Sequence, residues 1–197
     1  MPSNVSAFAV FFASIFTSNI LLTNYLGMCS FLAVSKEMKT SLGLGAAVTF
    51  VLAVTTPLNW LVYHYLLIPF NLEYLRFIVF IIVIAAFVQL TEMTLERYSE
   101  PLYQSLGIFL PLITVNCAIL GASLFMVIRE YTFITSLLFG LGSGIGWLLA
   151  IVAMSGIRTK LRTANIPPAL EGPGISLIIA GFMAMAFMGF SGMIAVS

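Results

Sequence analysis

Residues 110–121 read Leu-Pro-Leu-Ile-Thr-Val-Asn-Cys-Ala-Ile-Leu-Gly and lie inside an uncharged run that covers residues 101–128. A run of this length can cross a bilayer, which takes about 20 apolar residues as a helix. Pro111, Gly121 and the Asn116–Cys117 pair are unusual there, because proline removes a backbone donor and glycine weakens a helix. In lipid, freed backbone groups are tolerated only where they face protein or a cavity. The stretch therefore predicts an interrupted membrane helix.

A second interruption is expected around residues 23–31, which read Thr-Asn-Tyr-Leu-Gly-Met-Cys-Ser-Phe. This segment contains Cys29, and the chain has two cysteines in all. Both cysteines therefore lie beside predicted breaks in membrane helices. This coincidence is the main indication of function in the residues themselves.

The composition places the chain in a membrane. Of its 197 residues, 61% are hydrophobic and 8% are charged, and the mean hydropathy is +1.12. A soluble domain carries about 25% charged residues. The formal net charge of +1 argues against a nucleic-acid partner, which would need a basic face.

Charged residues divide the chain into six uncharged or nearly uncharged runs, which predict an all-α membrane protein with six transmembrane helices. The connecting segments are short, so residues 1–197 are expected to form a single integral membrane domain. The expected spans are 10–34, 42–67, 74–95, 102–128, 132–157 and 174–195.

The distribution of lysine and arginine predicts the orientation, because cytoplasmic loops are enriched in both. Arg76 and Arg129 follow the second and fourth spans. The loops after spans one, three and five carry six basic residues. The side of the membrane with these loops should be cytoplasmic, and both termini should face outward. The basic residues after spans one, three and five are Lys36, Lys39, Arg97, Arg158, Lys160 and Arg162.

The halves 1–98 and 99–197 suggest an internal repeat. Each half has three expected spans, a cysteine in the first, and Thr-Ser-Leu at the start of the second, at residues 40–42 and 135–137. Because three is an odd number, the two halves would be inverted relative to each other. Inverted repeats commonly hold a midplane site built from discontinuous helices, so the first helix of each half is expected to be discontinuous.

The third span contains a candidate ion-path residue, Glu92. The uncharged part of this span covers only residues 77–91, so a crossing helix must include a charged residue at one end. Glu92 would lie near the cytoplasmic end, with Glu96 one turn further along the same face. One interpretation is a solvated interfacial acid beside Arg97. The other is the mouth of a cation path, since acids within membranes often mark such paths.

Glycines at 140, 142, 144 and 146 resemble a nucleotide-binding loop, but they lie within a span that no strand precedes. Spaced four apart, Gly140 with Gly144 and Gly142 with Gly146 are expected to line one helix face for close packing.

The cysteines allow three interpretations. A buried free cysteine often only fills space, and a disulfide between Cys29 and Cys117 would leave the broken helices unexplained. Metal ligation explains both features, because loosened backbone can direct N–H groups at negatively charged sulfur. Zinc and iron–sulfur sites usually take four ligands. Two more would have to come from a second chain.

Three segments resemble a known family: the membrane subunits shared by the Na⁺-translocating NADH:quinone oxidoreductases and the Rnf complexes. They are residues 26–36 around Cys29, residues 106–118 around Cys117, and the tail 181–192. The resemblance covers nearly the whole chain. Gly-Ser-Gly-Ile-Gly-Trp at 142–147, with Met-Cys-Ser around Cys29, favours the E subunits of the quinone reductases over the A subunits of the Rnf ferredoxin:NAD oxidoreductases.

The resemblance implies a subunit of an enzyme complex in the bacterial inner membrane. The termini predicted to face outward would then be periplasmic. In the family, an E subunit pairs with a homologous D subunit of opposite orientation, and each contributes two cysteines to an intramembrane 2Fe–2S cluster. Cys29 and Cys117 match those ligands. NADH, flavins and ubiquinone would be bound by other subunits, with no catalytic residue in this chain. The Gln-Leu-Thr-Glu-Met setting implicates Glu92 in the uptake of Na⁺ for export.

Two alternatives belong to other classes of protein. A secondary ion transporter without a metal site would share inverted repeats and broken helices. A structural membrane scaffold would use both cysteines for packing.

Overall fold

A computed structural model describes residues 7–98, 110–162 and 172–189, and the regular elements in these ranges are all helices. The all-α class predicted from the sequence is therefore confirmed for this part of the chain. The elements in chain order are α1 (Ala7–Ile15), α2 (Met28–Val34), α3 (Met38–Val62), η1 (Tyr63–Leu67), η2 (Glu73–Leu75), α4 (Arg76–Tyr98), α6 (Leu110–Thr114), α7 (Cys117–Ile128), α8 (Phe133–Leu161) and α9 (Pro173–Met188).

Four segments are long and apolar enough to cross a membrane, and they correspond to the second to fifth predicted spans. The first predicted span is two short helices, α1 and α2, joined by a non-helical segment. The last is α9, with 16 residues. Six spans in two inverted repeats remain a prediction. The four long segments are Met38–Leu67, Glu73–Thr94, Pro111–Ile128 and Phe133–Leu161.

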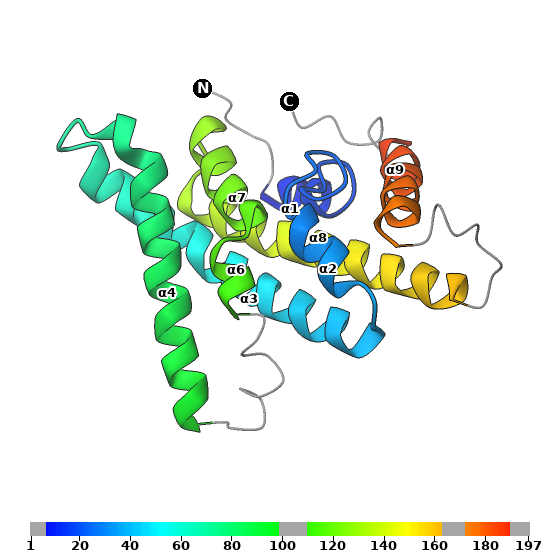
Figure 1. Cartoon of the computed structure of the whole chain (residues 1–197). Helices are drawn as coiled ribbons and strands as arrows, with labels where there is room; N and C mark the ends of the chain where they lie inside the picture. Colours follow the sequence, from blue (N-terminus) through cyan, green and yellow to red (C-terminus); the bar gives the residue numbers. More distant parts are fainter. Residues whose placement is uncertain (1–6, 99–109, 163–171, 190–197) are drawn as a thin grey trace.

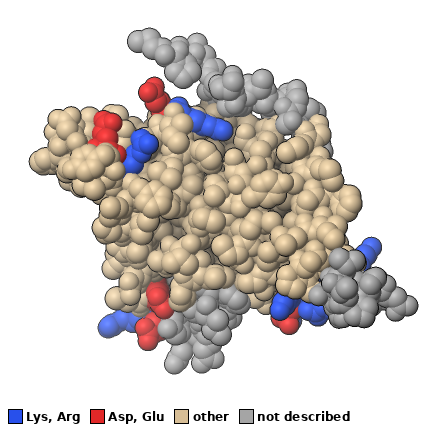
Figure 2. All heavy atoms as spheres, turned by 45° about the horizontal axis from the view of Figure 1, so that its top comes forward, with Lys and Arg blue, Asp and Glu red and all other residues tan. Residues whose placement is uncertain are grey.

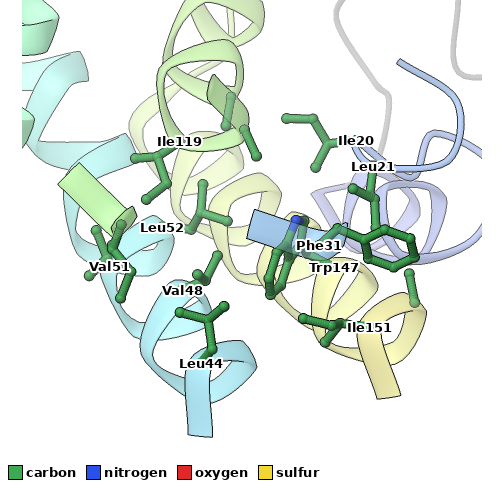
Figure 3. Packing of buried hydrophobic residues seen from close by; sticks show 14 of the residues in the cluster. Ile20, Leu21, Phe31, Leu44, Val48, Val51, Leu52, Ile119, Trp147 and Ile151 are labelled. Atoms are coloured by element: carbon green, nitrogen blue, oxygen red, sulfur yellow. The ribbon is translucent and has the colours of Figure 1, made fainter. Parts of the chain in front are cut away.

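Helices α3 and α8 run antiparallel through the middle of the molecule (Figure 1). Their closeness depends on glycine, since a Cβ on Gly144 would lie 2.7 Å from the Cα of Thr49 and one on Gly140 would lie 2.7 Å from the carbonyl oxygen of Leu52. Small residues of this kind let helix backbones approach in membranes. Fully buried apolar side chains fill the space beside the contact, among them those of Leu44 and Trp147 (Figure 3).

The prediction of a single glycine face on α8 was wrong, although the expected close packing is confirmed. Gly140 and Gly144 face α3, whereas Gly142 and Gly146 face α1, where Cβ atoms would meet the backbone oxygens of Phe11 and Ile15. The reason is geometric: residues two apart on a helix are separated by about 200° at 3.6 residues per turn. α8 is therefore held closely on two sides.

Helix α4 lies at one side of the molecule and α9 at the other (Figure 1). α4 buries one stripe, formed by Phe80, Ile84 and Val88 at a spacing of four residues. On the rest of the helix, Ile78, Ile82 and Leu90 are more than half exposed. So much exposed apolar surface suits lipid or neighbouring membrane subunits and would be unfavourable in water.

Charged side chains gather at two opposite edges of the molecule, with an uncharged band between them (Figure 2). At one end of the helices, Arg158 on α8 donates to the carbonyl oxygen of Leu32 at 2.9 Å and to the hydroxyl of Ser35 at 2.7 Å. Arg162 donates to the carbonyl oxygen of Lys36 at 2.8 Å. These bonds tie the end of α8 to the connection between α2 and α3.

Gly144→Ala is expected to lower the thermal unfolding midpoint of the purified protein in detergent. The new methyl group would meet the backbone of Thr49, so the helices would have to separate, and overpacking of this kind costs about 1–3 kcal/mol. Gly156→Ala on the same helix is the matched control, because its methyl group would lie 3.8 Å from the flexible end of Met38. Equal midpoints for the two variants would contradict the close α3–α8 contact.

Candidate functional site

The first helix interruption, residues 16–27, is organised by the side chain of Asn19, which is fully buried. Its Oδ1 accepts hydrogen bonds from the backbone N–H groups of Leu21 and Leu22 at 3.1 and 3.3 Å. Its Nδ2 donates to the carbonyl oxygens of Ile15 and Gly146 at 3.0 and 2.9 Å. One side chain thus satisfies backbone groups freed by the break and attaches the end of α1 to α8.

Gly27 ends this segment and precedes α2. Its φ of +85° lies in the left-handed region that favours glycine. A Cβ at this position would also be 2.8 Å from Nε1 of Trp147 and 3.1 Å from Oδ1 of Asn116. Cys29 follows in the first turn of α2, and its side chain is exposed.

The second interruption lies between α6 and α7, at Val115 and Asn116. Asn116 caps α7: its Oδ1 accepts the N–H of Ala118 at 3.1 Å. Cys117 is the first residue of α7 and is half-buried. The break thus coincides with the Asn–Cys pair, while Pro111 lies inside α6.

Gly121, the other unusual residue of this stretch, continues α7 without a break. A Cβ there would lie 2.5 Å from Cδ1 of Leu26. Its role is therefore close packing between the two interruptions.

The two interruptions meet, although they are distant in the sequence. The backbone N–H of Gly27 donates to the sulfur of Cys117 at 2.9 Å across 90 residues of chain. Beside it, Nδ2 of Asn116 donates to the hydroxyl of Ser30 at 3.3 Å, and that hydroxyl donates to the carbonyl oxygen of Gly27 at 3.0 Å. The structure thus brings the surroundings of both predicted ligands to one place.

The arrangement around the sulfur atoms suits negative charge. Both cysteines lie in the first turn of a helix, where free N–H groups and the helix dipole favour anions. Cys117 already accepts one N–H, and both cysteines are free thiols. A helix start therefore surrounds each cysteine, and at Cys117 an N–H donor is added to it.

The described part of the chain shows no complete metal site. Among these residues, no group of three or more histidine, cysteine, aspartate or glutamate side chains could hold a metal ion.

Glu92 occupies a different place, near the charged end of α4. Its side chain is half-buried, whereas Glu96 and Arg97 further along the helix are exposed. The residue lies within the apolar segment Glu73–Thr94, as the sequence predicts.

Comparison with known proteins is consistent with this arrangement. A model of the family described as "Rnf-Nqr subunit, membrane protein" matches residues 7–194, and so covers both interruptions and all the long helices. The chain belongs to the Rnf-Nqr family.

A relative within the Rnf-Nqr family is the E subunit of the Na(+)-translocating NADH-quinone reductase of Psychromonas ingrahamii. It is 54% identical over 194 residues, which cover 93% of this chain and 96% of the relative. The resemblance seen in the cysteine motifs is thereby confirmed.

The sequence did not identify several residues of this Rnf-Nqr site. The capping role of Asn116 had a local signal, since asparagine is favoured directly before a helix. The contact of Asn19 with Gly146 and that of Trp147 with the surroundings of Gly27 had no such signal, because only the tertiary fold brings these residues together.

Asn116→Ala is expected to lower the thermal unfolding midpoint in detergent, since losing an N-cap costs about 0.5–2 kcal/mol. The variant also removes the donor to Ser30. Asn116→Ser keeps a capping oxygen and should lose less. Equal stability of wild type and Asn116→Ala would show that this side chain does not hold the start of α7.

Proposed function

We propose that this chain is a membrane electron-transfer subunit of a Na⁺-translocating NADH–quinone reductase. In this proposal Cys29 and Cys117 supply two thiolate ligands to an intramembrane 2Fe–2S cluster, and a homologous partner subunit of opposite orientation supplies the other two. Membership of the Rnf-Nqr family and the name of the Psychromonas relative support the complex.

The observation that carries the cluster proposal is the hydrogen bond from the N–H of Gly27 to the sulfur of Cys117. It joins the two cysteine-bearing helix breaks, which packing cysteines would not require. N–H donors to ligand sulfur are a general means by which proteins stabilise and tune iron–sulfur centres.

When bound, a 2Fe–2S cluster accepts and releases single electrons. The chain's own residues would hold the two ligand cysteines in position for the cluster. Both cysteines lie in the first turn of a helix, at its positive end. Asn116 and Ser30 hold the two helix starts together at the hydrogen bond between their side chains, 3.3 Å long.

The partner is inferred from the missing ligands and from the exposure of Cys29 in this chain. A second subunit with an inverted fold, covering Cys29, would complete the four ligands about a pseudo-twofold axis. The same inverted relation is proposed within the chain, between residues 1–98 and 99–197, in a single membrane domain. NADH, flavins and ubiquinone would be bound by the remaining subunits.

Sodium would reach the complex near Glu92, and the ends carrying Lys36 and Arg158 would face the cytoplasm. Support comes from the half-buried position of Glu92 in an apolar segment and from the excess of basic residues at that end. Both termini would then be periplasmic in a bacterial inner membrane.

Cys29→Ser and Cys117→Ser are each expected to abolish one 2Fe–2S EPR signal in the purified complex. Iron content should fall by two per complex, because hydroxyl oxygen replaces thiolate sulfur at a ligand position. Met28→Leu, which removes a neighbouring sulfur that is not a thiol, is the control and should keep the signal. Unchanged iron and EPR in both cysteine variants would favour the metal-free transporter or the scaffold.

Glu92→Gln is expected to raise the Na⁺ concentration needed for half-maximal NADH–quinone turnover about tenfold or more, as loss of about 1.4 kcal/mol of binding would do. The 2Fe–2S signal should persist. Glu96→Gln, one turn further and exposed, is the matched control and should resemble wild type. An identical Na⁺ response in both variants would exclude Glu92 from the ion path.

A further inference from the structure

Trp147 on α8 carries a polar group that the fold leaves unused. Its side chain is fully buried, and its Nε1 has no hydrogen-bond partner among the described residues. The indole lies in the core cluster with Phe31 of α2 (Figure 3). A buried donor without an acceptor is uncommon in folded proteins, so its place needs an explanation.

The chain's other tryptophan shows the usual arrangement. Nε1 of Trp60 donates to the carbonyl oxygen of Tyr131 at 2.8 Å. The indole of Trp60 also stacks on His64, with ring centroids 4.7 Å apart. The buried part of Trp60 therefore includes an N–H group that has a backbone acceptor, unlike that of Trp147.

Trp147 also differs from the other buried polar atoms that lack a partner in the described segments. Ser136, Ser143 and Ser155 carry hydroxyls that can rotate to the backbone of their own helix. Asn59 has an unpaired oxygen, but its amide nitrogen donates to Ser123 at 2.8 Å. An indole has a single donor in a rigid ring, so its N–H must find an acceptor where the ring is held.

The indole N–H is held at the meeting point of the two interruptions. Nε1 lies 2.8 Å from the place that a Cβ of Gly27 would occupy, and Cβ of Ala118 and Oδ1 of Asn116 are each 3.1 Å from that place. The N–H of this same glycine donates to the sulfur of Cys117, and Ala118 is the next residue after it. The indole N–H of Trp147 thus lies beside the glycine whose own N–H reaches that sulfur.

We propose that the N–H of Trp147 donates a second hydrogen bond to the Cys117 sulfur when that sulfur is a cluster-ligating thiolate, and that it helps to set the reduction potential there. A thiol sulfur is a weak acceptor, whereas a thiolate is a strong one, so the donor gains its partner only when the metal is bound. This inference rests on the proposed function. Trp147 is a positioning residue, because it acts through Cys117.

The expected effect on the potential has a definite sign. A donor to ligand sulfur stabilises the more negative, reduced cluster. Trp147→Phe, which keeps an aromatic ring and removes the N–H, should therefore lower the midpoint potential of the 2Fe–2S signal. Trp60→Phe is the matched control, since it removes the chain's other indole, and should leave the potential unchanged.

The test uses the intact complex, with tryptophan labelled with ¹⁵N at the indole nitrogen. Pulsed EPR of the reduced wild-type complex should show a ¹⁵N coupling that is lost in Trp147→Phe and kept in Trp60→Phe. Absence of the coupling in the wild type would overturn the inference without any variant. A coupling that persists in Trp147→Phe with an unchanged potential would assign it to another tryptophan and would also overturn it.

These outcomes are distinct from failure of the proposed function. If the wild type shows no 2Fe–2S signal that depends on Cys29 and Cys117, the cluster proposal itself fails. If that signal is present but Trp147→Phe leaves both the potential and the ¹⁵N coupling unchanged, only the role of Trp147 fails.

Discussion

The fold depends on satisfying backbone groups where two helices stop inside an apolar layer. A bilayer supplies no water for freed N–H and carbonyl groups, so the protein must provide the partners itself. Asn19 does this at the first break with four hydrogen bonds, and Asn116 caps the helix after the second. The hydrogen bond from Gly27 to Cys117 then joins the two breaks.

The glycines of α8 allow the two breaks to come into contact. Gly142 and Gly146 let α1 and the first break lie against α8, and Gly140 and Gly144 let α3 lie against its other side. The carbonyl of Gly146 is itself an acceptor for Asn19. Close packing and polar satisfaction are therefore parts of one arrangement, in which larger residues would displace the first break from the second.

The sequence was sufficient for features that depend on local chemistry. Low charge and long apolar runs predicted the helical membrane class, and the residues around Cys29 and Cys117 correctly indicated both breaks. It could not locate the second break within its stretch, since Pro111 and Gly121 were as unusual as Asn116. It also missed Asn19 and Trp147, because Asn19 reaches Gly146 and Trp147 lies beside Gly27, each more than 100 residues away along the chain.

The exposure of the two cysteines suits the proposal that this chain forms its site together with a second subunit. Cys29 is exposed and Cys117 is half-buried, while Gly27, Asn116 and Trp147, which meet beside Cys117, are buried. These three residues therefore belong to the core of this chain, whereas the two cysteines lie nearer its surface. Such a division fits a centre shared between two subunits: each would keep its ligands fixed before assembly, and only contact between the subunits would complete the site.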